Sequence, residues 1–166
     1  MCGIFAYFGN NKLTEKKLKL LDRYANYSQH RGPDNTNSLQ INDTSYFVFH
    51  RLMINDQSSL GNQPLVHPDD KDIILICNGE IYNFKDLCHK NNFNMYSGSD
   101  CEVIIHMYKK FGIEETVKNL DGVFAFVLFD RRNNQIWCAR DPIGVRSLYI
   151  AKSENGIAFS SELKSI

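Results

Sequence analysis

The 166-residue sequence lacks the features that mark membrane, secreted and zinc-stapled proteins. No apolar run approaches the roughly 20 residues that span a bilayer, and the N-terminus has no charged segment followed by a long apolar one. Its five cysteines are an odd number without a CxxC pair, which argues against a disulfide framework and a cysteine-rich zinc site. These absences favour a reducing compartment, and we expect the cytoplasm.

A charge imbalance is missing as well. The 19 Lys and Arg residues equal the 19 Asp and Glu residues, so the net charge gives no reason to expect binding to nucleic acid or to an anionic membrane. Prolines number only four, and neither a repeat nor a low-complexity linker divides the chain. With 43% hydrophobic residues, the sequence is long enough to bury a core, and we expect one domain.

Apolar runs and helix-capping residues along the sequence predict an α+β fold. Apolar runs predict strands at 2–9, 46–52 and 72–80, and residues 122–141 are typical of a β-hairpin turning at 131–134. Thr14 is a candidate N-cap for a helix, and a second helix is expected from Ser99 or Asp100 to Gly112. Residues 160–164 are typical of an N-cap and a first helical turn, so this end either packs tightly or continues in a longer chain. Because strands cluster rather than alternate with helices, antiparallel pairing is favoured.

Cys2 is a candidate nucleophile. Removal of Met1 would leave a thiol and a free α-amine on one residue, and an α-amine pKa of about 7.7–8.0 suits a base near neutral pH. Nucleophile and base then need no histidine. One alternative is that Cys2 is a small buried hydrophobic residue. Another is that Cys101 is the nucleophile, because a helix N-terminus lowers a thiol pKa.

Asn78 and Gly79 follow an apolar strand and are candidate oxyanion donors. Asn78 offers a side-chain N–H, and Gly79 offers a backbone N–H that a substrate can approach closely because no Cβ intervenes. A plain Asn-Gly turn is the alternative interpretation.

An amino-acid substrate needs partners for its carboxylate and its ammonium group. Arg51, at the end of a predicted strand, can bind a carboxylate with two N–H groups, while Asp100 and Glu80 can take the ammonium. The alternatives are a surface arginine and an N-capping aspartate. Only the joint occurrence of these residues favours a binding site.

Seven blocks of sequence, in one order, resemble the glutaminase domain of the asparagine synthetases. This is a class II glutamine amidotransferase domain of the N-terminal nucleophile hydrolase superfamily. The resemblance covers residues 2–166, and its blocks are MCGI, RGPD, HRLMI, NGEIYN, SGSDCEV, LDGVFAFVLFD and RDPIGVRSLY. Related phosphosugar and purine amidotransferases share the start and the NG element, whereas NGEIYN and RDPIGVRSLY are closer to the asparagine synthetases.

The resemblance implies a fold and a set of roles. The fold is a four-layer αββα sandwich of two antiparallel sheets, in which Cys2 is the nucleophile and its freed α-amine is the base. Asn78 and Gly79 form the oxyanion hole, and Arg51 holds the glutamine α-carboxylate. The α-amine is held by Asp100 and Glu80. The pocket is lined, largely through the backbone, by Leu52, Met53, Ile54 and Asn55.

The implied activity is hydrolysis of L-glutamine to glutamate and ammonia through a γ-glutamyl thioester, without metal or cofactor. The ATP-dependent synthetase domain, which would need ATP and Mg²⁺ to convert aspartate to asparagine, is absent from this chain, because neither a Ser-Gly-Gly pyrophosphate loop nor GxxxxGK occurs. The expected partners are therefore L-glutamine and a synthetase domain or subunit. The alternatives are a non-catalytic regulatory or assembly module and a glutaminase domain that serves a different acceptor.

Three positions depart from the family pattern. Met53 and Asn55 stand where a small and an apolar residue are usual, and Ser147 replaces a proline. The first two are expected to alter the shape of the pocket or its affinity for glutamine. None of the three is an inferred catalytic group.

Overall fold

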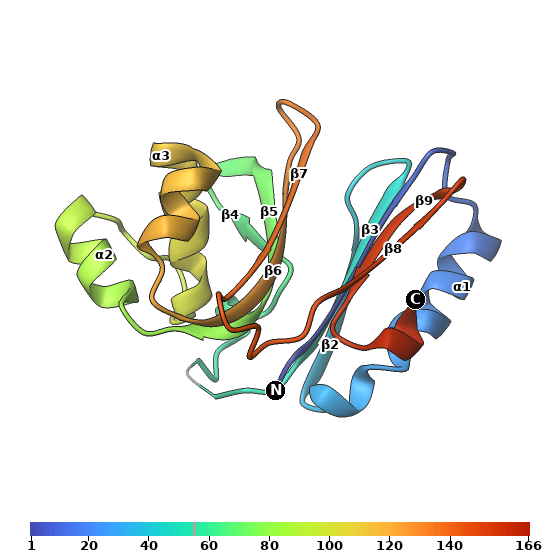
Figure 1. Cartoon of the computed structure of the whole chain (residues 1–166), viewed down its shortest axis with the longest axis horizontal. Helices are drawn as coiled ribbons and strands as arrows, with labels where there is room; N and C mark the ends of the chain where they lie inside the picture. Colours follow the sequence, from blue (N-terminus) through green and yellow to red (C-terminus); the bar gives the residue numbers. More distant parts are fainter. Residues whose placement is uncertain (55) are drawn as a thin grey trace.

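A computed structural model describes residues 1–54 and 56–166 and contains two antiparallel sheets (Figure 1). The first sheet has five strands in the order β2-β3-β1-β9-β8. Their bounds are β1 (Gly3–Gly9), β2 (Asn35–Gln40), β3 (Ser45–Arg51), β8 (Tyr149–Ser153) and β9 (Gly156–Ser160).

The second sheet has four strands in the order β4-β5-β6-β7. Their bounds are β4 (Leu65–His67), β5 (Asp70–Ile81), β6 (Gly122–Asp130) and β7 (Gln135–Arg140). β4 pairs with the first half of β5 only, from Leu65 opposite Leu75 to His67 opposite Asp70. From Cys77 onward, β5 is not paired with β4, and we call this side of the strand the open edge of β5.

Helices cover the outer face of each sheet (Figure 1). α1 (Glu15–Asn26) packs on the first sheet, and α2 (Phe84–Asn91) and α3 (Val103–Asn119) pack on the second. Short 3₁₀ turns complete the chain at η1 (Gln29–Arg31), η2 (Ser59–Gly61), η3 (Asp100–Glu102) and η4 (Leu163–Ser165). The layers run helix, sheet, sheet, helix, so the expected αββα sandwich is confirmed.

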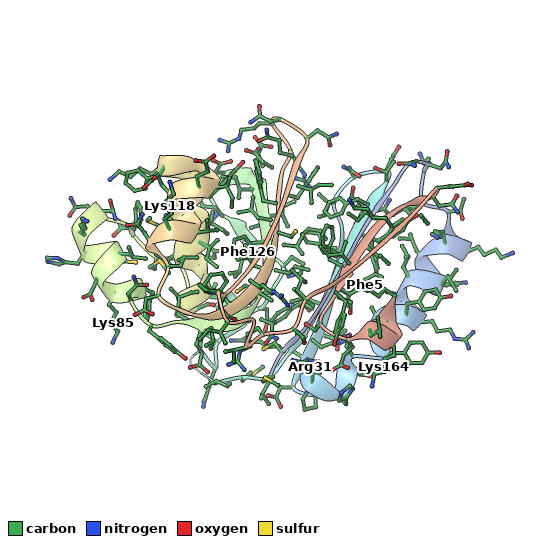
Figure 2. The ribbon with its side chains drawn as sticks, in the orientation of Figure 1. Phe5, Arg31, Lys85, Lys118, Phe126 and Lys164 are labelled. Carbon is green, nitrogen blue, oxygen red and sulfur yellow. The ribbon has the colours of Figure 1, made fainter. Side chains whose placement is uncertain are left out.

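Strand alternation divides the apolar side chains among three cores. Phe126 packs between the second sheet and its helices, and Phe5 packs between the first sheet and α1. Figure 2 shows both rings well inside the molecule, whereas Lys85 and Lys118 lie at its periphery. The middle core lies between the sheets and includes Ile4, Phe49, Ile76, Val127 and Phe129.

Local signals placed several element boundaries correctly. The Thr14 side chain accepts a hydrogen bond from the Lys17 N–H at 3.3 Å, which confirms the predicted N-cap. The hairpin of β6 and β7 turns at residues 131–134 as expected, with Asn134 at a φ of 51°. Within the described residues, no helix is both long and apolar enough to cross a lipid bilayer.

Other boundaries differ from the sequence prediction. Gly112 has a φ of 77° and interrupts α3, but helical structure resumes and continues to Asn119. Residues 160–164 do not begin an α-helix, because β9 runs to Ser160 and the last turn, Leu163–Ser165, is 3₁₀. Ser161 is instead bonded to the first strand, since its N–H donates to the Ile4 carbonyl at 3.0 Å and its Oγ accepts from the Ile4 N–H at 3.1 Å.

Candidate active site

One cavity brings together most of the residues that the sequence singled out. Its volume is about 60 Å³, which is small beside the roughly 300–1,000 Å³ of drug-sized pockets. The predicted site residues that line it are Cys2, Arg51, Leu52, Ile54, Gly79, Glu80 and Asp100. Asn78 and Met53 do not line it, and Asn55 lies outside the described residues.

Strand alternation turns three of the candidate side chains toward the layer between the sheets. Cys2, Arg51 and Asn78 each stand two residues from a member of the middle core: Ile4, Phe49 and Ile76. Residues two apart on a strand share a face, so nucleophile, cation and amide all point toward the inter-sheet layer. Cys2 itself packs against that core.

The thiol of Cys2 lies against the backbone of Leu52. The Leu52 N–H donates to Sγ at 3.4 Å, and the thiol donates to the Leu52 carbonyl at 3.6 Å. Burial raises the pKa of the Cys2 thiol, and the Leu52 bond opposes that shift only in part. A raised pKa favours the thiol over the thiolate, so a base that removes the proton would assist attack on a substrate.

Arg31 fixes the backbone around the nucleophile. Its Nε–H donates to the Cys2 carbonyl at 2.9 Å, and its Nη1 donates to Glu162 Oε1 at 2.7 Å. Figure 2 labels Arg31 at the lower side of the molecule, near the place where Figure 1 marks the N-terminus. The N-terminal residues are thus tied to the end of the chain through one guanidinium group.

Asn78 is a buried amide with an unpartnered donor. Its side chain is 2% exposed, and Nδ2 has no hydrogen-bond partner among residues 1–54 and 56–166. A buried N–H group without an acceptor costs roughly 1–3 kcal/mol, so such groups are rare unless a ligand uses them. The amide N–H is therefore available to an acceptor oxygen.

The N–H of Gly79 belongs to the open edge of β5. On that edge, the Cys77 N–H donates to Gln63 Oε1 at 2.6 Å and the Ile81 N–H donates to Asp100 Oδ2 at 2.6 Å. Successive N–H groups of a strand point to opposite sides, so the N–H of Gly79 lies on the same edge as those of Cys77 and Ile81. It is therefore directed away from β6.

The reason for a glycine at this position differs from the one that the sequence suggested. A Cβ on Gly79 would lie 2.7 Å from both the Phe124 Cβ and the Val123 carbonyl of β6. The missing side chain therefore lets β5 and β6 pack closely, rather than clearing a path for substrate. Close strand packing holds the N–H in a fixed position.

Arg51 is buried and partly occupied by protein acceptors. Its Nη1 donates to the Ser58 carbonyl at 2.7 Å and to Asn62 Oδ1 at 2.6 Å, and its Nη2 donates to the Asp56 carbonyl. A guanidinium has five N–H groups. The Nε–H and one Nη2 hydrogen have no bond to a described residue. Both can therefore donate to the oxygens of a carboxylate. The alternative of a surface arginine is wrong.

Asp100 does not cap a helix, contrary to one sequence interpretation. It begins η3, its carboxylate accepts the Ile81 N–H of β5, and the Ser99 side chain makes no capping bond either. A buried carboxylate at the cavity wall is suited to a cationic partner. Glu80 is more exposed and lies 3.7 Å from Arg146 Nη2.

The residues that follow Arg51 differ in what they contribute to the cavity. Leu52 contacts the thiol through its backbone, as expected, and Ile54 lines the cavity. The Met53 N–H instead donates to Asp34 Oδ2 at 2.8 Å.

The rival nucleophile Cys101 has an unsuitable environment. Its pKa is raised, first by its neighbour Cys77 and then by burial, so the expected lowering at a helix N-terminus is wrong. Its sulfur is 3.8 Å from the Gly79 carbonyl. Cys77 is buried in the core, and Cys138 is exposed on β7.

Sequence reasoning missed Gln63, whose side chain completes the edge of β5. Its amide accepts from the Cys77 N–H at 2.6 Å and donates to the Cys77 carbonyl at 3.0 Å, in place of a strand partner. No local pattern marks such a residue, because its partner is 14 positions away along the chain.

Comparisons with known proteins show the family to which the chain is related. The sequence pattern of the family described as glutamine amidotransferase domain matches residues 1–166. Asparagine synthetase (glutamine-hydrolyzing) 1 of Arabidopsis thaliana is 42% identical over 168 residues, which cover 100% of this chain and 28% of that protein. The corresponding Bos taurus protein is 41% identical over 169 residues, or 100% of this chain and 29% of that protein.

A solved structure shares the fold. Glutamine phosphoribosylpyrophosphate amidotransferase from B. subtilis, complexed with ADP and GMP, has a TM-score of 0.77 and 19% identity, and the match covers 99% of this chain and 42% of that chain. At that identity the likeness supports the N-terminal nucleophile hydrolase fold alone. The chain spans less than a third of the length of the curated relatives it matches.

Proposed function

Because the chain belongs to the glutamine amidotransferase domain family, we propose that it hydrolyses L-glutamine to glutamate and ammonia through a γ-glutamyl thioester on Cys2. The observation that carries this proposal is the buried, unpartnered Nδ2 of Asn78, which lies on β5 between the cavity-lining residues Cys77 and Gly79. Its role is to receive the oxyanion of a tetrahedral intermediate. No cofactor is required, since the chain supplies nucleophile, base and donors.

The first step uses the α-amine of Cys2 after Met1 has been removed. The amine takes the thiol proton, directly or through a water molecule, and the sulfur forms a bond to the side-chain carbonyl carbon of glutamine. Burial raises the pKa of the thiol, which favours a mechanism with such a base. The residues described as lining the cavity include no histidine, which favours the α-amine for the role.

Asn78 and Gly79 then stabilise the charge that develops on oxygen. The amide N–H of Asn78 and the edge N–H of Gly79 donate to the oxyanion, and neither donor must reorganise during the reaction. Collapse of the intermediate breaks the carbon–nitrogen bond, and the ammonium form of the base returns the proton to the leaving ammonia. Water then attacks the thioester, releasing glutamate and restoring the thiol.

The head group of glutamine is bound by opposite charges. The α-carboxylate accepts two N–H groups from the free side of the Arg51 guanidinium, and the α-amine contacts Asp100, with Glu80 beside it. Leu52 and Ile54 complete the wall, and we propose Asn55 as a further lining position. A substrate without either charge is expected to bind weakly.

Ammonia is the product that a partner consumes. We propose an ATP-dependent synthetase domain or subunit as that partner, with aspartate as its acceptor, because the relatives named above are asparagine synthetases over their full length. ATP and Mg²⁺ belong to that partner. All five cysteines are unpaired thiols, which supports a reducing compartment such as the cytoplasm.

The test compares the processed chain with one whose N-terminus is blocked by an uncleaved peptide tag. Intact mass identifies loss of Met1, and release of glutamate and ammonia from glutamine measures turnover. The proposal predicts turnover only in the chain that begins at Cys2, because a blocked amine is an amide and cannot act as a base. Equal turnover by the tagged chain would exclude the α-amine. Absence of turnover in both would favour a non-catalytic module.

A further inference from the structure

A buried carboxylate next to the head-group site has no role in the chemistry described above. Glu102 ends η3, two residues after Asp100, and its side chain is fully buried. Its Oε1 accepts the Tyr96 N–H at 2.8 Å, and its Oε2 accepts the Ser97 N–H at 2.8 Å and the Ser97 hydroxyl at 2.5 Å. One side chain thus holds the irregular segment that leads into Asp100.

A histidine completes the shell of Glu102. His106, one turn further along α3, places Nε2 at 3.0 Å from Oε1. Its ring stacks on Phe93 at 5.2 Å between centroids and meets His67 edge-on at 5.0 Å. Burial raises the pKa of Glu102, but the bonds from His106, Ser97 and Tyr96 outweigh it, so the pKa lies below its usual value.

The hydrogen bonds continue from Glu102 to the cavity wall. The Ser97 hydroxyl that donates to Glu102 also accepts the Ser99 N–H at 3.2 Å, and the Glu102 N–H donates to the Ser99 carbonyl at 3.1 Å. Ser99 and Asp100 both line the cavity. The Gly98 N–H adds a bond to Asp56 Oδ2 at 2.9 Å from the opposite loop.

We infer that Glu102 is a positioning residue, which fixes segment 96–99 and so holds the Asp100 carboxylate where the α-amine of glutamine binds. This inference rests on the proposed function, because it needs glutamine as the substrate. Glu102 touches neither substrate nor nucleophile and acts through Ser97 and Ser99. A glutamine side chain at this position keeps the volume but replaces one acceptor oxygen with a donor that faces an N–H group.

The test uses two substrates that differ only in the α-amine. Glutaramate is glutamine without that amine, so the ratio of kcat/KM for glutamine over glutaramate measures how well the amine is bound. Glu102→Gln is expected to lower kcat/KM for glutamine about tenfold through KM, since a charge-assisted hydrogen-bond network is lost, and to leave glutaramate within about twofold. The ratio therefore collapses, whereas general destabilisation lowers both values together.

Asp130→Asn is the matched control. Asp130 is also a buried carboxylate, which accepts from the Tyr108 hydroxyl at 3.0 Å and from Arg132 at 2.8 Å, but it lies at the far end of β6. The control is expected to lower stability and to leave the substrate ratio unchanged. If Glu102→Gln does not fold, Ser97→Ala removes the link to Ser99 and is expected to lower the same ratio about threefold.

The outcomes separate this inference from the proposed function. Wild-type turnover of glutamine with an unchanged ratio in the folded Glu102→Gln and Ser97→Ala variants would overturn the positioning role and leave the function standing. A wild-type chain that begins at Cys2 and neither hydrolyses nor binds glutamine, as measured by titration calorimetry, would overturn both. A ratio that falls in both variants and not in Asp130→Asn supports the inference.

Discussion

The two sheets contribute to the cavity in different ways. The first sheet presents reactive and charged groups at strand ends, the Cys2 thiol and the Arg51 guanidinium, held by loop and backbone contacts. The second sheet carries N–H donors, the Asn78 amide and the edge N–H of the half-buried Gly79, and the pairing of β5 with β6 holds this strand in place. Under the proposed function, the first sheet supplies the nucleophile and the second sheet supplies fixed N–H dipoles for the transition state.

The largest expected effect distinguishes the Cys2 thiol from the Cys101 thiol, both of which line the cavity. Cys2→Ala should lower glutamine turnover by about 10³-fold or more, because a covalent step is lost, while Cys101→Ala should leave turnover within about threefold. Ammonia release under saturating glutamine measures both variants. Retained activity in Cys2→Ala with loss in Cys101→Ala would move the nucleophile to η3, which packs against the second sheet, and reverse the comparison.

A smaller effect is expected from the donor on the second sheet. Asn78→Ala should lower kcat by about 10²- to 10³-fold with little change in KM, because the amide acts on the oxyanion and not on the bound substrate. Steady-state kinetics with glutamine give the two constants separately. Asn42→Ala, in the turn between β2 and β3, removes a bond to the Thr44 N–H at 2.9 Å and serves as the control. A rise in KM alone would assign Asn78 to substrate binding.

The smallest expected effect concerns Asp141, which joins the loop after β7 to β6. Asp141 is buried and accepts four backbone N–H groups, from Phe124, Gly144, Val145 and Arg146. Burial raises its pKa, but these bonds outweigh that effect and leave the pKa below the usual value. Because the folded pKa is depressed, the stabilisation is present above the ordinary pKa of about 3.9 and is lost as pH falls through the folded value.

Asp141→Asn should therefore lower the free energy of unfolding by about 1–3 kcal/mol at neutral pH, since one oxygen becomes a donor that faces two N–H groups. The difference from wild type should shrink below about pH 4. Urea unfolding at a series of pH values measures it. A difference that stays constant down to pH 3 would show that the charge of Asp141 does not contribute.

Local chemistry made much of the fold predictable. Thr14 has the hydroxyl that caps a helix, and the apolar runs of β1, β5 and β6 are long enough to identify as strands. Gly112 was a weaker guide, because its positive φ interrupts α3 without ending it. The pairing order of the strands depends on contacts between distant residues, such as Phe5 with Val48 and Ser160, which no local pattern reveals.

The candidate site also contains residues that could be predicted from the sequence and residues that could not. Residue type and order were enough to nominate Cys2, Asn78 and Arg51, because each carries a distinctive chemical group. The supports could not be predicted, since Gln63 and Glu102 act through backbone groups that only the folded chain brings near. The pKa of Cys101 was misjudged for the same reason, because the neighbouring Cys77 and burial outweigh the helix end.

The most direct measurement is the mass of the chain during turnover. Acid quenching with excess glutamine, followed by peptide mass spectrometry, reports the residue that carries the γ-glutamyl group. The account predicts that group on Cys2 of a chain that has lost Met1. A glutamyl group on Cys101, or on a chain that retains Met1, would contradict it.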